Sequence, residues 1–432
     1  MKNIKLLVTF MLSLFLVSYA PKPEEGMYPV SFLESMDLTA MGLGIDANEI
    51  FNPNGNGLIN AIVNLNGCTG SFVSNDGLIL TNHHCVFSSL RPHTTEKNNY
   101  MRDGFLAQDK LQELPMEGFR VKIMKSYKDI SSAVLKGVAS AKSALERDEI
   151  IRKNIAEIRE EEEKANPSME INISEMLVGA SYFVFRYEFL DDVRLVYVPA
   201  RYIGEFGGET DNWMWPRHSG DFSFVRAYTS KDGKPAKFNK DNIPYKPQRF
   251  LKVNPQGVGQ DDLVFILGYP GTTFRHYPAS FINYMETVQM PYISETWAWQ
   301  IDYMERLAKE SDANMIKYSN RIKRLANTTK NYKGKLQSLR RIGLAEKKKE
   351  EEFVVYEKLQ ATNTELAENY QATLDEMNRI YKEMTEYGPR RFWFYQMRTA
   401  SNYYSIARML NQVAGLLESD ASKYTPELAE KI

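Results

Sequence analysis

The sequence of 432 residues has almost no net charge and very little cysteine, and it carries a single long apolar run. A formal net charge of −1 gives no indication of a nucleic-acid or anionic-membrane partner, because both require a basic surface. No second apolar stretch approaches the roughly 20 residues of a membrane-spanning helix, so no span is predicted. The sequence contains neither Gly-x-Ser-x-Gly nor Gly-x-Ser-Gly, and this excludes a recognisable nucleophile elbow.

The amino terminus has the pattern of a secretory signal peptide. Lys2 and Lys5 precede an apolar run over residues 6–17, and small residues follow up to Ala20. We therefore expect residues 1–20 to be a signal peptide and the mature protein to be exported, to the periplasm or the cell surface.

Export places the two cysteines, Cys68 and Cys85, in an oxidising compartment. A bridge between them would close a loop of about 16 residues. The loss of loop-closure entropy in the unfolded chain would then stabilise the fold by about 3 kcal/mol. Two buried free thiols are the alternative, but free thiols tend not to persist in such compartments, so we expect the disulfide.

Two kinds of secondary-structure pattern divide the chain. Short apolar runs separated by turn signals predict an antiparallel sheet or barrel. These runs cover residues 61–65, 71–74, 78–81, 181–189, 193–199, 222–229 and 263–267. Residues 131–165 have helical spacing, which predicts a helical excursion from the sheet, and the helical pattern returns from residue 296. The expected domains are a sheet domain over 21–278 and an all-helical domain over 279–432.

Residues 81–85, Thr-Asn-His-His-Cys, are a candidate for catalysis. His84 directly precedes an expected half-cystine at the end of an apolar strand, and an imidazole that titrates near neutrality suits a general base. A metal site built from His83, His84, Cys85 and His218 is an alternative. Neighbours in a strand point to opposite faces, however, which is poor geometry for joint ligation.

The loop over residues 207–221 gathers two tryptophans, two glycines, a proline, several acids and a histidine before a predicted strand. Such a loop on a rigid sheet indicates a binding edge, and a tight structural loop with an aromatic plug is the alternative. Asp221, at the start of the strand, could accept a hydrogen bond from His84 and fix its tautomer, as the third member of a triad does. Without a serine motif this constellation is incomplete.

These segments resemble the S46 peptidases, the bacterial dipeptidyl-peptidases related to types 7 and 11. Residues 66–70 and 81–85 are similar to the histidine segment of the family, and residues 206–223 match its aspartate segment nearly residue for residue. Residues 25–27 and 325–331 are similar to two further segments. The long aspartate motif is very specific, whereas the short motifs would be weak alone.

The resemblance implies an α+β fold, in which a chymotrypsin-like antiparallel β-barrel, the first of a double barrel, is followed by a helical domain that caps the cleft. It implies that His84 is the general base and that Asp221 orients it. It also implies that Asn212, Trp213 and Asn327 bind the free amino group of the substrate. Amide oxygens accept hydrogen bonds from an ammonium, and an aromatic face attracts a cation.

No cofactor and no metal are implied. The implied partners are oligopeptide substrates and, because the family is dimeric, a second copy of the chain. In this family the serine comes from a second barrel after the helical domain, and the sequence stops within that domain. We therefore expect a serine dipeptidyl-peptidase by family whose nucleophile lies beyond this chain, and no activity from this chain alone. The alternative is a non-catalytic peptide-binding protein that retains the amino-group site.

Overall fold

The computed structural model describes residues 27–52, 56–260, 262–274, 277–400 and 402–419. The expected signal peptide, residues 1–20, lies outside the described residues. Within them no helix is both long and apolar enough to cross a membrane.

Two units make up the chain. The sheet unit extends to Gly208 and resumes over Arg217–Thr273, and the helical unit consists of Glu209–Pro216 and the residues from Phe274 on. The eight-residue segment Glu209–Pro216 is thus inserted in the sequence of one unit but belongs to the other.

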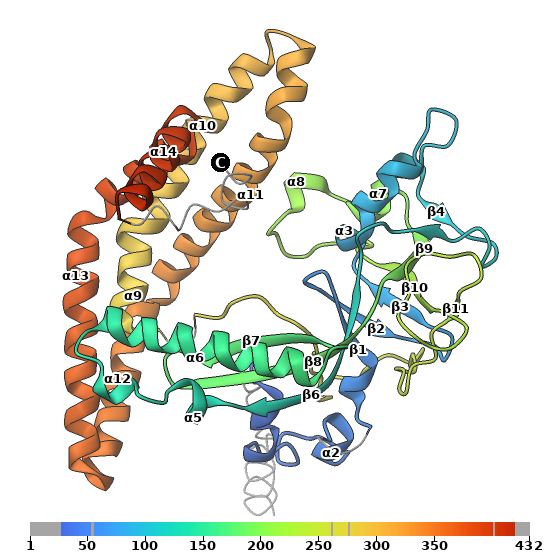
Figure 1. Ribbon diagram of the computed structural model, residues 1–432. Coiled ribbons are helices and arrows are strands. Elements are labelled where there is room, and N and C mark those ends of the chain that lie inside the picture. Colours follow the sequence, from blue (N-terminus) through green and yellow to red (C-terminus); the bar gives the residue numbers. More distant parts are fainter. Residues whose placement is uncertain (1–26, 53–55, 261, 275–276, 401, 420–432) are drawn as a thin grey trace, which may run out of the picture. The chain divides into compact units, whose positions relative to one another are not determined.

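Eleven strands of the described chain form one antiparallel sheet in the sheet unit (Figure 1). In chain order they are β1 (Ile62–Leu65), β2 (Cys68–Phe72), β3 (Leu78–Thr81), β4 (Phe105–Leu106), β5 (Leu114–Pro115), β6 (Val121–Asp129), β7 (Glu170–Leu177), β8 (Ser181–Leu190), β9 (Asp192–Val198), β10 (Ser223–Thr229) and β11 (Ile243–Pro244). Across the sheet the order is β4-β9-β10-β3-β2-β1-β6-β8-β7, with β5 beside β9 and β11 beside β10. Together with the helical region, this large antiparallel sheet gives the predicted α+β class.

Helices precede the first strand or lie between strands in the chain, and most of them are short. They are η1 (Val30–Ser35), α2 (Ala47–Ile50), η2 (Leu58–Ala61), α3 (His83–Val86), η3 (Phe87–His93), α4 (Tyr100–Asp103), α5 (Ser131–Val134), η4 (Val138–Ser140), α6 (Ala144–Ala165), α7 (Arg201–Gly204) and α8 (Gly208–Asp211). Of these, α6 is the long one, with 22 residues.

The first hairpin follows from its turn residues. Asn66 and Gly67 both have positive φ, 49° and 96°, which is the backbone that a two-residue turn between antiparallel strands requires. The Asn64 side chain accepts a hydrogen bond from the Gly67 amide at 2.8 Å and holds the turn. Leu65 is therefore paired with Cys68, and the register of β1 and β2 is set locally.

Alternating apolar residues of the strands form the main core of the sheet unit. Its fully buried members include Val63, Phe72, Ile79, Leu195 and Val225, all at 0% exposure. Strands β3 and β10 have neighbouring strands on both sides, so their ends are held rigidly. The residues that follow β3 and those that precede β10 are therefore attached to a rigid part of the sheet.

The predicted helical excursion is confirmed over α5, η4 and α6, which follow β6 and precede β7 in the chain; α5 and α6 are labelled in Figure 1. The Ser143 hydroxyl caps α6 by accepting a hydrogen bond from the Glu146 amide at 3.1 Å. The apolar face of α6 packs at Ile151 into a second cluster with Val134 and Val184.

The strand predicted over residues 263–267 is wrong. Residues 262–267 form no strand in the described chain, and the side chains of Val264 and Ile266 are 66% and 97% exposed. Apolar alternation alone does not make a strand, because its backbone N–H and C=O groups need a neighbouring strand.

The helical unit contains α9 (Ala279–Tyr284), the π-helical turn η5 (Met285–Gln289), α10 (Met290–Ala308), α11 (Asp312–Ile342), α12 (Leu344–Thr362), α13 (Thr364–Ala400) and α14 (Asn402–Ser419). The Ser311 side chain caps α11 at its start, and Gly343, with a left-handed backbone at φ 60°, separates α11 from α12. Tyr284, Met285 and Met290 form the buried centre of this unit.

Candidate active site

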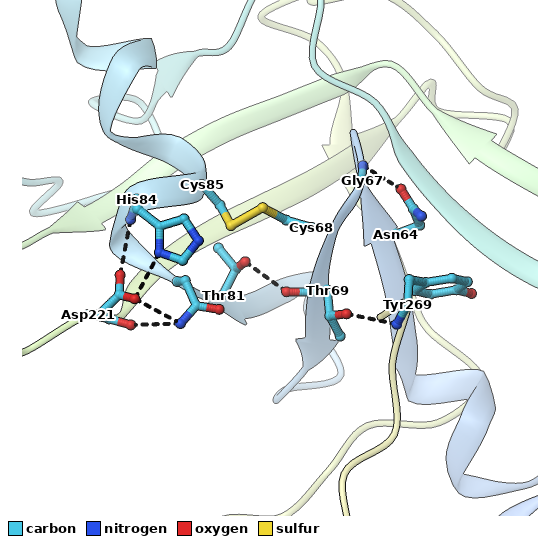
Figure 2. The surroundings of a disulfide bond; sticks show 10 residues. Asn64, Gly67, Cys68, Thr69, Thr81, His84, Cys85, Asp221 and Tyr269 are labelled. Atoms are coloured by element: carbon cyan, nitrogen blue, oxygen red, sulfur yellow. Dashed lines mark hydrogen bonds and ion pairs between the residues drawn. A yellow bond between two sulfur atoms is a disulfide. The ribbon is translucent and has the colours of Figure 1, made fainter. Parts of the chain in front are cut away.

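The ends of two neighbouring strands bring His84 and Asp221 together. Strands β3 and β10 pair with Thr81 opposite Ser223, so the residues just after β3 face the residues just before β10. His84 Nδ1 lies 2.8 Å from Asp221 Oδ2, and the His84 backbone N–H donates to Asp221 Oδ1 at 3.0 Å (Figure 2). Residues 137 positions apart in sequence thus share two hydrogen bonds.

Asn82 adds a further hold on the same carboxylate. Its side-chain Nδ2 donates to the backbone O of Asp221 at 3.1 Å and to Oδ2 at 3.3 Å. Asp221 therefore has N–H donors on both carboxylate oxygens, which fixes its orientation. Sequence reasoning did not single out Asn82, although it lies within the segment considered for catalysis.

The Asp221 contact determines which proton His84 carries. A carboxylate only accepts, so the Nδ1 atom that faces it holds the ring proton, and Nε2 is the nitrogen left to accept one. The His84 side chain is 68% exposed and that of Asp221 is 34% exposed. This arrangement suits a general base with an oriented ring and an accessible second nitrogen.

Cys68 and Cys85 form the expected disulfide, with their Cα atoms 6.3 Å apart. The bridge joins β2 to α3 at the residue directly after His84 (Figure 2). A hydrogen bond of 2.9 Å from the Thr81 hydroxyl to the Thr69 carbonyl also joins β3 to β2. Both links tie the His84 turn to the centre of the sheet.

The disulfide bears on the alternative of a metal site. Potential ligand atoms of Cys68, His84 and Cys85 lie within 4.8 Å of one another. The two sulfur atoms are bonded to each other, however, and metal binding by cysteine requires a thiolate. His83 is fully buried, whereas His84 and His218 are exposed, so the histidines of that alternative lie in different environments.

Within the helical unit, Asn212, Trp213 and Asn327 form a contact group that we call the Asn–Trp–Asn cluster. The Asn212 side chain donates to Asn327 Oδ1 at 2.7 Å. The indole N–H of Trp213 donates to Asn327 Oδ1 at 3.0 Å and to the Asn327 backbone O at 3.1 Å. The structure therefore brings all three residues that the sequence grouped into one place.

Lys330 supports this cluster and was missed by the sequence interpretation. Its Nζ donates to the backbone carbonyls of Glu209 at 2.7 Å and Thr210 at 2.6 Å. Lys330 follows Asn327 by three residues on α11, and this spacing places both on the same helix face. The spacing was the signal available in the sequence.

Comparisons with known proteins place the chain in a family. Residues 23–431 match the family described as Peptidase S46. The chain is 34% identical over 383 residues to an Asp/Glu-specific dipeptidyl-peptidase of Capnocytophaga gingivalis, covering 88% of this chain and 53% of that protein. It is 35% identical over 359 residues to dipeptidyl-peptidase 7 of the same organism, covering 82% and 50%.

Among solved structures, the chain is similar to a crystal structure of Porphyromonas endodontalis DPP11 in complex with the dipeptide Arg-Asp. The TM-score is 0.72 at 31% sequence identity, and the likeness covers 85% of this chain and 53% of that one. The chain spans about half the length of the curated relatives it matches. The match extends over both the sheet and the helices, and the chain belongs to the peptidase S46 family.

Proposed function

We propose that this chain contributes the general base and its orienting carboxylate to a serine-type dipeptidyl-peptidase, which releases dipeptides from the free amino terminus of oligopeptides. The observation that carries the proposal is the 2.8 Å contact between His84 Nδ1 and Asp221 Oδ2. The relatives named as dipeptidyl-peptidases support the reaction class.

In the proposed mechanism, His84 Nε2 takes the proton of the serine hydroxyl as the serine oxygen attacks the carbonyl of the second residue. The same nitrogen then returns the proton to the leaving amine, and His84 next takes a proton from a water that attacks the acyl-serine, so that the dipeptide is released and the serine regains its proton. Asp221 keeps the ring in the Nδ1–H tautomer and stabilises the imidazolium that forms. The second hydrogen bond, from the His84 backbone to Asp221, supports this role by holding the carboxylate beside the ring in both protonation states.

We propose that the serine is supplied by residues outside these 432, in a second barrel, and that the sheet described here corresponds to the first barrel of a chymotrypsin-like pair. The matched stretches cover only 53% and 50% of the two relatives, which supports this division. On this proposal residues 21–278 are the peptidase domain and residues 279–432 are part of a helical cap domain.

The Asn–Trp–Asn cluster is proposed to bind the substrate's amino group. Asn327 Oδ1 already accepts hydrogen bonds from Asn212 and Trp213, which uses both of its lone pairs. An arriving ammonium would compete with these donors for Asn327 Oδ1, while the 57% exposed indole of Trp213 offers a face for cation–π attraction. Binding at this position would limit cleavage to two residues from the end.

We also propose that the protein is exported and that it acts as a homodimer. The pattern of residues 1–20 supports export, and the dimer rests on the resemblance to the family.

The test of the base uses the full-length gene product and a dipeptidyl amide with a chromogenic leaving group. Replacing His84 by Gln should lower kcat by at least about 10³-fold, since an amide cannot take the serine proton. The matched control is His93→Gln, because His93 Nε2 contacts the Pro115 carbonyl at 2.9 Å and a glutamine amide can still donate there. A His84→Gln enzyme with kcat close to that of the control would reject the proposed base.

The test of the amino-group site uses calorimetry on the 432-residue chain with short peptides, free or acetylated at the amino terminus. Free peptides should bind more tightly, and Asn327→Ala should remove the difference while Asn331→Ala retains it. Equal affinity for free and acetylated peptides would eliminate the amino-group site. Tight, selective binding by a full-length protein that never cleaves would favour the non-catalytic peptide-binding alternative.

A further inference from the structure

His83, the neighbour of His84, is completely buried. Its ring is 0% exposed and packs on Phe87, with 4.7 Å between the ring centroids. On the other side it meets Gly204 so closely that a Cβ atom there would lie 2.5 Å from the His83 Cγ and Nδ1 atoms. The ring therefore fills the space between α3 and the end of α7, and only glycine fits opposite it.

This buried ring lacks the partners that buried polar groups normally have. Neither Nδ1 nor Nε2 of His83 has a hydrogen-bond partner within the described part of the chain. Leaving such a group unpaired is unfavourable, and a phenylalanine of similar shape would avoid the loss. Packing alone thus does not explain why a histidine lies at this position.

The elements around His83 carry both members of the His84–Asp221 pair. Helix α3 contains His84 itself, and α7 leads into the loop that ends at Asp221. That loop is fastened back onto α7, because the Gly220 backbone N–H donates to the Ile203 carbonyl at 2.8 Å. The His83 ring lies between the turn that carries the imidazole and the helix that anchors the carboxylate.

We propose that His83 is a positioning residue whose neutral ring sets the His84 turn against the loop of Asp221, and that a proton on His83 separates the pair. The effect of His83 on catalysis rests on the proposed function. The alignment of His84 with Asp221, in contrast, can be measured without turnover. His83 thus aligns the base when its ring is neutral, and protonation of His83 in acid removes that alignment.

The charges around His83 fit this behaviour. Burial lowers the pKa of His83 below its ordinary 6.5, opposed by the carboxylates of Glu205 and Asp221 and assisted by His84 and Arg201. Arg201 and Glu205 are paired with each other at 2.8 Å, so the field of one is partly cancelled by the other. A proton added to the ring would therefore be a buried cation with no direct acceptor.

The sign of the pH effect follows from the lowered pKa. Below pH 6.5 the unfolded chain binds a proton at His83 that the folded chain still excludes. The stability contributed by the neutral ring is therefore complete above pH 6.5 and declines as the pH falls through the region below it. The His84–Asp221 pair should be lost over the same interval.

The test uses the 432-residue chain labelled with ¹⁵N in histidine, and NMR of the ring nitrogens reports the tautomer of His84. At pH 7.5 the wild type and His83→Phe should both show His84 as Nδ1–H, whereas His83→Ala should lower the ratio of Nδ1–H to Nε2–H by about tenfold. Gly204→Ala, which drives a methyl into the His83 ring, should do the same, and Gly271→Ala, with open space at its Cβ position, should not.

The second measurement is the pH dependence of stability and of kcat/KM. It does not depend on a variant that folds poorly. The wild type should lose stability below pH 6.5 more steeply than His83→Phe. In the full-length enzyme the acid limb of kcat/KM should change from two protons in the wild type to one in His83→Phe. Retention of the Nδ1–H tautomer in both His83→Ala and Gly204→Ala, or the same acid limb in wild type and His83→Phe, would overturn the inference. Loss of the tautomer together with an active His84→Gln enzyme would instead reject the proposed function and leave the positioning role standing.

Discussion

At the scale of single residues, hydrogen bonds fix the orientation of the Asp221 carboxylate as well as that of the His84 ring. Its two carboxylate oxygens contact the backbone and ring of His84 and the side chain of Asn82. An amide of the same shape can occupy the position of this carboxylate. Replacing Asp221 by Asn therefore removes the negative charge with little change in geometry.

Asp221→Asn should lower kcat of the full-length enzyme by about 10⁴-fold with little change in KM, because an amide N–H facing Nδ1 favours the wrong tautomer. Steady-state kinetics with a dipeptidyl amide measures both constants. Asp241→Asn, at an exposed surface position, is the matched control. A loss of less than tenfold would show that Asp221 does not control the tautomer of the base.

Lys330→Met should weaken the binding of free-amino peptides by about tenfold, since two charge-assisted hydrogen bonds to the segment before Asn212 are lost. Acetylated peptides should be affected much less, because they do not use the Asn–Trp–Asn cluster. Calorimetry of both peptide types measures the difference. Lys333→Met, at an exposed position on the same helix, should leave both affinities unchanged, and equal losses for both peptide types would contradict the role of Lys330.

At the scale of elements, the disulfide fastens the turn that carries the base to the second strand of the sheet. Replacing Cys68 and Cys85 together by Ala should lower the free energy of unfolding of the sheet unit by about 3 kcal/mol, the value for closing a loop of about this length. Urea unfolding followed by circular dichroism measures the change. Reductant should destabilise the wild type by the same amount and leave the double variant unaffected, and a reductant effect on the variant would show another cause.

Helix α6 is joined to the sheet by a bidentate ion pair that is largely buried. Arg186 on β8 contacts both carboxylate oxygens of Glu162, at 2.6 and 2.8 Å, and the two side chains are only 17% and 16% exposed. Glu162→Ala should cost about 3 kcal/mol of stability, because it leaves a poorly hydrated guanidinium. Glu157→Ala on the exposed face should change it by less than about 0.5 kcal/mol, and a double-mutant cycle between Glu162 and Arg186 separates their coupling from general damage.

Local signals explain which elements the sequence predicts well. The strand over residues 78–81 has the predicted bounds, and the turn at Asn66 and Gly67 fixes its own hairpin. Strand β6 was not predicted, because its sequence is interrupted by lysines and it is a strand only through its partners β1 and β8. The error at residues 263–267 has the opposite cause, since the pattern was present there and the partner was absent.

The same distinction applies to the site. The pairing of His84 with Asp221 was predictable from the chemistry of a triad and from the resemblance to a family, not from their spacing of 137 residues. Lys330 and His83 were missed because their roles lie in contacts between segments. The spacing of Lys330 from Asn327 shows a shared helix face but not the two backbone carbonyls that Lys330 contacts, and a buried imidazole behind a glycine has no signature in a single stretch of sequence.

At the scale of the whole molecule, the proposed catalytic pair and the proposed amino-group site belong to different units. Because the nucleophile is proposed to lie outside these 432 residues, the chain alone should bind peptides without cleaving them, with no dipeptide released above the uncatalysed rate from a dipeptidyl amide. Mass spectrometry of the products measures this, and the full-length gene product serves as the positive control. Dipeptide release by the chain alone, abolished by His84→Gln, would contradict the placement of the nucleophile outside it.

The inserted segment Glu209–Pro216 gives the molecule three covalent crossings between its units, after Gly208, Pro216 and Thr273. One backbone cut at Thr273 therefore cannot yield two intact pieces, because the amino-terminal fragment retains Asn212 and Trp213 while the carboxyl-terminal fragment retains Asn327. Each fragment would carry part of a recognition site that neither can complete. The proposed amino-group site is therefore complete only while the two fragments stay associated, and their separation after proteolytic nicking would remove it without changing any residue of the base.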